Sequence, residues 1–226
     1  IDYALKLKQI EQHQVEDTCF IQVSDKQKGL LNYFSNNILH SFALPALVAT
    51  ALSHGDTQVS AIHNYVVQLY PFFKEELFLK WQANELEAAI EQILHAFSVL
   101  NWIKQNDDVI ELQQPRSLQA LADIMASSLT NLGLMAEILS KFAHTESLGL
   151  SKLEKLTKIG LKNMLASGDL ANSSYFDKST VKTFSQTLKS LNLAQVQGGS
   201  IQLEQADALD VLKKPHPQAQ QALNQA

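Results

Sequence analysis

The sequence predicts a mainly α-helical fold with two modules that each combine helices with a β-hairpin. Two observations lead to this prediction. Apolar residues recur at the three- and four-residue spacing of amphipathic helices through most of residues 27–166. A pattern of helix, short strand, polar turn and second strand occurs twice. With 46% hydrophobic residues, the chain can bury a core without disulfides or metal ions.

An internal repeat defines the two modules. Residues 94–112 align without gaps with residues 185–203, so that Leu100-Asn101 matches Leu191-Asn192. In both copies we expect an amphipathic helix to end at the Leu-Asn pair and to lead into a β-hairpin. This order is typical of winged-helix folds, so the modules are predicted to be winged-helix-like.

The repeat also predicts how the chain is divided. Residues 26–114 are expected to form a helical module with the first hairpin, and residues 115–204 a helical module with the second hairpin. Residues 1–25, which include a strand candidate over 18–23, are predicted to be a strand and linker remnant of an upstream domain. Residues 205–226 are predicted to form a polar C-terminal tail.

Prolines suggest where the first helices end. A helix that starts near residue 27 is expected to kink or restart at Pro45, because proline lacks the amide donor of an interior helical turn. A second helix over 56–70 is expected to stop at Pro71 and to resume over 72–82.

The later helices are predicted from their apolar stripes. A helix with a clear stripe follows residue 84. Residues 117–142 contain few charges, which predicts a largely buried helical hairpin with its bend at Gly133. Residues 151–166 predict an amphipathic helix.

Composition and charge exclude several classes of function. A net charge of −5 argues against a nucleic-acid partner, because such a protein must offset backbone phosphate. The longest largely apolar run, residues 42–52, is shorter than the roughly 20 residues that span a bilayer. We therefore expect any contact with a membrane surface to be peripheral. Cys19 is the only cysteine, so we predict no internal disulfide. We also predict no metal site and no cofactor site.

Two blocks of the sequence resemble a known family. Residues 31–47 read LNYFSNNILHSFALPAL, and residues 69–81 read LYPFFKEELFLKW. They resemble the C-terminal region of the bacterial membrane-bound glycerol-3-phosphate acyltransferases, with similarity over about residues 31–204. The resemblance implies part of an enzyme that transfers an acyl group from acyl-CoA or acyl carrier protein to the 1-hydroxyl of glycerol 3-phosphate. It also implies a place at the cytoplasmic face of the inner membrane and a role in phospholipid biosynthesis.

The catalytic motif of that family is absent from this chain. In the family a histidine acts as general base, and an aspartate five positions later orients it. None of the seven histidines here has an aspartate at that position, and the chain opens on Ile1 rather than on methionine. We therefore expect a fragment without catalytic residues, whose partner is an upstream acyltransferase domain of the same polypeptide.

Four polar residues share one face of the first predicted long helix. Tyr33, Asn36, Asn37 and His40 stand at positions i, i+3, i+4 and i+7. They could face a ligand, or they could support the helix against a neighbouring domain. The second interpretation is favoured because buried polar groups are usually paired, and because the matching block of the family has the same residue types. These four residues are our domain-interface candidates.

Four lysines lie on the helix predicted over 151–166. Lys152, Lys155, Lys158 and Lys162 are expected to form one basic stripe opposite three apolar residues, Leu153, Leu156 and Ile159. Such a stripe can bind anionic lipid. It can also be a solvated face, which the interrupting Glu154 and the acidic chain favour.

Other patterns support weaker alternatives. Glu91 and His95 are one turn apart, and a solvated or salt-linked pair is favoured over a metal site because no third ligand is near in sequence. An independent winged-helix-like protein-interaction or DNA-binding module is the alternative function. Its presumed recognition helix, residues 178–192, offers only Lys178, Lys182 and Lys189 to phosphate.

Overall fold

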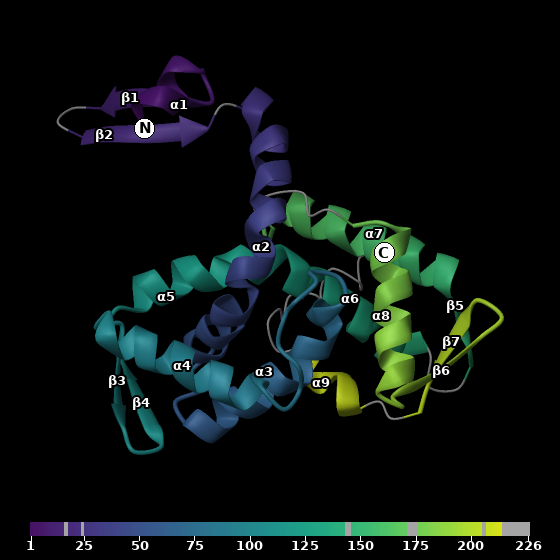
Figure 1. Cartoon of the computed structure of the whole chain (residues 1–226). Helices are drawn as coiled ribbons and strands as arrows, with labels where there is room; N and C mark the ends of the chain where they lie inside the picture. The colour runs from purple at the N-terminus through teal and green to yellow at the C-terminus, as the bar shows by residue number, and fades with distance from the viewer. Residues whose placement is uncertain (16–17, 24, 143–145, 171–175, 205–206, 214–226) are drawn as a thin grey trace. The chain divides into compact units, whose positions relative to one another are not determined.

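The structure, a computed structural model, describes residues 1–226 apart from 16–17, 24, 143–145, 171–175, 205–206 and 214–226 (Figure 1). For residues 15, 18, 25–26, 28–37 and 208 it describes the backbone alone. The chain divides into two units, Ile1–Ser41 and Phe42–Ala226. The domain boundaries expected from the sequence stay predictions.

The first unit holds a short helix, a β-hairpin and the start of a long helix. Helix α1 (Asp2–Lys6) precedes strands β1 (Ile10–Val15) and β2 (Thr18–Val23), which pair in antiparallel fashion. The strand predicted over 18–23 is therefore confirmed. Its partner β1 was not predicted, because the run IEQHQV lacks the alternation of apolar residues that signals a strand.

Two long helices continue through proline. Helix α2 (Asp25–Ser53) contains Pro45, and α3 (Val59–Lys74) contains Pro71. The stop predicted at Pro71 and the helix over 72–82 are therefore wrong, and residues 75–78 form turns. At Pro45 the helix does not restart, and the alternative of a kink stays a prediction. An interior proline costs about 3 kcal/mol. Burial of neighbouring side chains, such as Leu44 and Phe73 at 0% exposure, offsets this cost.

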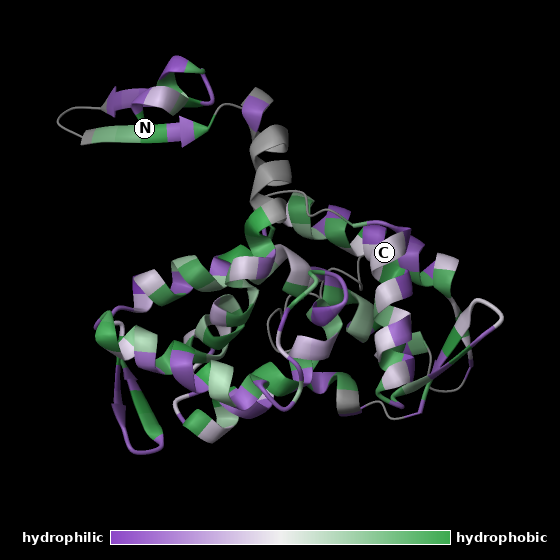
Figure 2. Cartoon of the chain, viewed as in Figure 1, coloured by the Kyte–Doolittle hydropathy of each residue, from purple (hydrophilic) through white to green (hydrophobic). Residues whose placement is uncertain are grey.

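The second unit contains the same arrangement of elements twice. The first copy consists of α3, α4 (Leu86–Val99), β3 (Ile103–Asn106) and β4 (Val109–Leu112). The second consists of β5 (Leu148–Gly149), α7 (Leu150–Ser167), α8 (Lys178–Ser190), β6 (Ala194–Gln197) and β7 (Ser200–Leu203). In both copies a helix leads into an antiparallel hairpin, which confirms the predicted order. Figure 2 shows hydrophobic and hydrophilic residues alternating along α7 and α8, as expected for amphipathic helices.

The copies agree in backbone detail where the helix passes into the hairpin. Asn101 and Asn192 both have a positive φ, 60° and 56°, a conformation that asparagine tolerates. The Trp102 carbonyl accepts the N–H of Gln113 at 2.8 Å. The counterpart carbonyl, that of Leu193, accepts the N–H of Glu204, the first residue after β7, at 3.0 Å. The sequence repeat therefore reflects a repeated backbone.

The repeat extends further than the sequence indicated. The Val59 N–H donates to the Asp108 carbonyl at 3.0 Å, and the Leu150 N–H donates to the Gly199 carbonyl at 2.9 Å. Each bond joins the start of a helix to the turn of its hairpin, and one constant offset along the chain relates the two bonds. Helices α3 and α7 are therefore counterparts. Classification of the modules as winged helices stays a prediction.

A helix with a fully buried central segment follows the first copy. Helix α5 (Pro115–Ala122) leads through a 3₁₀ turn, η1 (Asp123–Met125), into α6 (Ala126–Phe142). Every residue from Leu129 to Leu139 in α6 is buried. The predicted burial is therefore confirmed for α6, whereas α5 has only Leu118 and Ala122 buried. The bend predicted at Gly133 is wrong, because α6 continues through this residue and the break falls at η1.

Gly133 allows a close approach instead. A Cβ atom here would lie 3.2 Å from the carbonyl oxygen of Leu212 in α9 (Asp210–Lys213), which follows the 3₁₀ turn η2 (Asp207–Leu209). Leu209 and Leu212 are buried at 0% and 1% exposure. The prediction of a polar tail is therefore wrong for this segment, and residues 214–226 lie outside the described residues. None of the helices within the described ranges has the length and apolar character that a membrane crossing requires.

The turn after α3 holds a bulky residue in a conformation that suits glycine. Phe78 has a φ of 52° and is 89% exposed. The next residue, Leu79, donates its N–H to the Lys74 carbonyl at 3.0 Å and so closes the end of the helix. A side chain in the left-handed region costs about 1 kcal/mol or more, and this ring gains little from burial.

We expect Phe78→Gly to raise the free energy of unfolding by about 0.5–1 kcal/mol, because glycine adopts a positive φ without steric cost. Thermal or urea unfolding measures the change. Phe78→Ala is the matched control, since it removes the ring but keeps the Cβ atom, and it should leave stability nearly unchanged. Equal gains from both variants would contradict the backbone explanation.

Candidate functional site

Helix α7 begins and ends at glycines. Gly149 precedes it with extended backbone, and Gly168, with a φ of 83°, ends it in the left-handed conformation. One face of the helix is buried and includes Leu153, Leu161 and Met164. Leu161 and Met164 pack with Leu134 of α6 in one cluster. The opposite face is therefore held toward solvent by the core beneath it.

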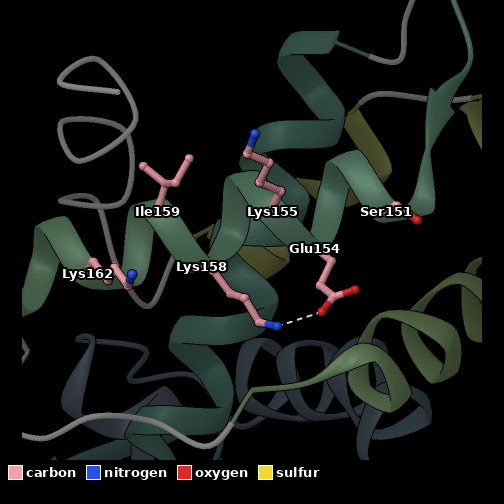
Figure 3. Close-up of a pocket in the computed structure, with 6 residues that line it drawn as sticks. All are labelled: Ser151, Glu154, Lys155, Lys158, Ile159 and Lys162. Carbon is pink, nitrogen blue, oxygen red and sulfur yellow. Dashed lines mark hydrogen bonds and ion pairs between the residues drawn. The ribbon is translucent and has the colours of Figure 1, made fainter.

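A pocket of about 430 Å³ lies on this exposed face (Figure 3). Among the residues that the structure describes, those that line it lie on α7: Ser151, Glu154, Lys155, Lys158, Ile159 and Lys162. Three of the four predicted lysines thus share one pocket. The fourth, Lys152, lies on the same helix with its Nζ atom 5.9 Å from the centre of the Phe142 ring. The structure therefore brings the predicted lysines together on one surface, which we call the lysine surface.

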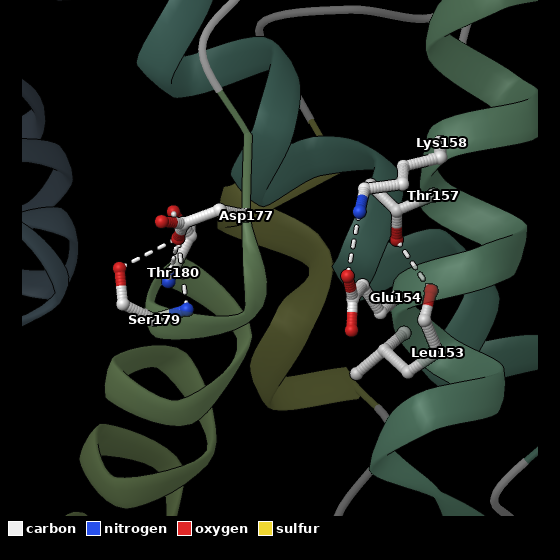
Figure 4. Close-up of polar contacts among 7 residues, drawn as sticks. All are labelled: Leu153, Glu154, Thr157, Lys158, Asp177, Ser179 and Thr180. Atoms are coloured by element: carbon white, nitrogen blue, oxygen red, sulfur yellow. Dashed lines mark hydrogen bonds and ion pairs between the residues drawn. The ribbon is translucent and has the colours of Figure 1, made fainter.

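Among these described lining residues Glu154 alone carries a carboxylate, and it pairs with a lysine. Its Oε1 atom lies 2.6 Å from Nζ of Lys158, one helical turn away (Figure 4). The lysine side chain is 49% exposed, so the pair contributes at most about 0.5 kcal/mol. Three lysines and one carboxylate give the described lining a net positive charge.

The sequence predicted the wrong face of α7 for one apolar residue, Ile159. Ile159 was predicted opposite the lysines with Leu153 and Leu156, but it lines the pocket between them. The reason is helical geometry, because Ile159 follows Lys155 by four residues and therefore lies beside it. Leu153 is fully buried, as predicted. The lysine surface thus has an apolar centre.

The neighbouring helix α8 starts at a well-formed cap. The carboxylate of Asp177 accepts the backbone N–H groups of Ser179 at 2.8 Å and Thr180 at 3.1 Å (Figure 4). Asp177 also acts on Glu76, whose pKa is raised by partial burial and, second, by the negative charge of Asp177. The two carboxylates therefore repel each other when both are ionised.

The domain-interface candidates lie on α2. The structure describes only the backbone of Tyr33, Asn36 and Asn37, so their side chains lie outside the described part of the chain. His40 is exposed. One continuous helix keeps all four at the predicted spacing. They belong to the first unit, whereas the lysine surface belongs to the second.

Glu91 has a partner that the sequence did not indicate. Its Oε1 atom lies 2.9 Å from Nε2 of His63 on α3, and His63 is far from Glu91 in sequence. Only the packing of α3 and α4 reveals this pair. Within the described ranges, no group of three or more His, Cys, Asp or Glu side chains could hold a metal ion. A cavity of about 110 Å³ beside Thr50 and His54 is smaller than usual ligand pockets.

The family model described as the glycerol-3-phosphate acyltransferase C-terminal region matches residues 1–197. The chain belongs to this family. It is similar to curated proteins named glycerol-3-phosphate acyltransferase. The one from Actinobacillus pleuropneumoniae serotype 3 is 29% identical over 196 residues, which cover 85% of this chain and 23% of the relative. The one from Pseudomonas aeruginosa is 33% identical over 175 residues, which cover 75% of this chain and 21% of the relative.

The chain therefore spans less than a quarter of the length of these two glycerol-3-phosphate acyltransferases. The family match starts at residue 1, whereas the sequence resemblance described above begins at about residue 31. The hairpin of β1 and β2 thus belongs to the region that the glycerol-3-phosphate acyltransferase family shares.

The raised pKa of Glu76 predicts a pH-dependent effect on stability. Because the folded state disfavours the ionised form, the stability associated with protonated Glu76 is fully present below its ordinary pKa of 4.5. It is lost as the pH rises through the raised folded pKa. We expect Glu76→Gln to raise the melting temperature at pH 7 and to change it little near pH 4. Glu75→Gln, at the exposed neighbouring position, is the matched control. The same shift at both pH values would rule out this explanation.

Proposed function

We propose that the chain is the non-catalytic C-terminal helical portion of a glycerol-3-phosphate acyltransferase, and that it packs on or docks the acyltransferase domain. The proposal rests on the family match over residues 1–197, combined with relatives that are about four times longer than the matching region. The parent enzyme would transfer an acyl group from acyl-CoA or acyl carrier protein to the 1-position of glycerol 3-phosphate. Its place would be the cytoplasmic face of the inner membrane.

The side chains of this region support a role outside the chemical step. Transfer of an acyl group to a hydroxyl requires a positioned general base. The histidine-aspartate spacing of the family occurs nowhere in the sequence. The pair of His63 and Glu91 lines neither the lysine-lined pocket nor the small cavity near His54. These observations favour catalysis by residues of another domain.

The purified chain is expected to transfer no acyl group from acyl-CoA to glycerol 3-phosphate above a boiled control. Formation of the acylated product from labelled glycerol 3-phosphate measures this. The Pseudomonas aeruginosa relative, assayed in the same buffer and detergent, is the positive control. Turnover by this chain alone would place catalytic residues within it and would contradict the proposal.

Helix α2 offers the surface that we assign to docking. Tyr33, Asn36, Asn37 and His40 place four hydrogen-bonding side chains at helical spacing, and polar groups in an interface fix its register by pairing. The same part of the helix also exposes apolar surface, at Ile38 with 55% exposure. Exposed apolar surface next to polar groups is common where a second protein surface binds.

A chimaera tests the docking role. In the Pseudomonas aeruginosa relative, the 175 matching residues are exchanged for the corresponding part of this chain. We expect the chimaera to be active, and alanine at all four candidate positions to lower its activity by at least tenfold, roughly the loss of 1.4 kcal/mol of interface energy. Asn64→Ala with Gln68→Ala on α3 is the matched control, because both side chains are exposed and they pair with each other at 2.9 Å.

Two results would contradict the docking proposal. One is full activity of the relative after its matching region has been deleted. The other is full activity of the chimaera that carries the four alanines. A melting temperature for the isolated variant chain that equals the wild-type value shows that lost activity does not come from misfolding.

A further inference from the structure

The repeat provides an internal comparison for the lysine surface. Because α3 and α7 are counterparts, each lysine of α7 has an equivalent position on α3. At the positions of Lys152, Lys155, Lys158 and Lys162, helix α3 has Ala61, Asn64, Val67 and Pro71. The same backbone therefore forms without any cation at these positions. The lysines are not required by the fold.

The charges are also unfavourable for the helix that carries them. Like charges three and four residues apart repel one another on a helix surface. Within the described part of the chain, Glu154 offsets one of the four lysines. Residues 141–189 hold eight of the chain's 18 basic residues but only four of its 23 acidic ones. A positive region is thus concentrated on a chain whose net charge is −5.

Apolar groups lie within and beside this positive surface. Ile159 forms part of the pocket lining between the lysines (Figure 3). Phe142, beneath the Nζ atom of Lys152, is 48% exposed, and Leu165 in the last turn of α7 is 43% exposed. Lysines mixed with exposed apolar side chains along one helix are typical of helices that lie at a lipid interface.

We propose that the lysine surface of α7 binds an anionic phospholipid bilayer, with a headgroup phosphate in the pocket between Lys155, Lys158 and Lys162. The pocket volume of about 430 Å³ accommodates a phosphate-bearing headgroup. Nζ groups supply the positive charge, and Ile159, Phe142 and Leu165 contact the acyl boundary. This surface lies in the second unit, so the inference does not depend on the docking surface assigned to α2.

Binding of the full chain to vesicles tests this inference. Vesicles of equal parts phosphatidylglycerol and phosphatidylcholine are compared, at low salt, with vesicles of phosphatidylcholine alone. We expect binding only to the anionic vesicles. Replacement of all four lysines by glutamine is expected to weaken that binding by about tenfold to a hundredfold, since each lysine near an anionic surface contributes several-fold.

A charge-matched variant is the control. Lys6, Lys8, Lys104 and Lys178 are exposed and lie away from the pocket lining, so their joint replacement by glutamine changes the net charge equally. We expect the control to keep wild-type vesicle binding. Both variants should keep the wild-type melting temperature, because none of the eight side chains is buried.

Several outcomes would overturn the inference. Equal vesicle binding by wild type and the α7 variant would do so, as would an equal loss in the charge-matched control. Binding of inorganic phosphate without any binding of anionic vesicles would identify a site for free phosphate instead. Tighter binding of duplex DNA than of anionic vesicles, lost in the α7 variant, would identify a nucleic-acid surface.

Discussion

Burial of α6 on every side is the constraint on which the second unit depends. Because every residue of Leu129–Leu139 is buried, other elements must cover this segment of the helix around its whole circumference. Helix α7, β7 of the second hairpin and α9 near the C-terminus all pack against it. At Gly133 the backbone of α9 comes so close that a side chain would have little room. The second copy of the repeat and the C-terminal segment are thus tied to one helix.

The two copies of the repeat show which features the backbone demands and which it leaves free. Asparagine with a positive φ stands at the helix end of both copies, and the same hydrogen bonds close both hairpins. The exposed faces of α3 and α7, by contrast, carry different residues at equivalent positions. Exposed positions can therefore change without loss of the fold, and differences between the copies point to function rather than to folding.

In the described part of this chain, surfaces rather than reactive groups are the candidate functional features. Its histidines are dispersed, and the pair of His63 and Glu91 joins two helices. Lysines, by contrast, lie together on the exposed face of α7, whose opposite face packs against the core. The docking role and the lipid contact that we propose both depend on rigidly placed surface side chains more than on reactive groups.

The sequence by itself determined the helical class, the family, the repeated helix and hairpin, and the lysine stripe, because each depends on residues close together in the chain. It did not determine that α2 and α3 continue through Pro45 and Pro71, since burial by distant side chains offsets the local cost of proline. The pairing of Glu91 with His63, the packing role of Gly133 and the burial of Leu209 and Leu212 were decided only by tertiary structure. Each of these involves residues that are distant in sequence, and such contacts leave no periodic signal to read.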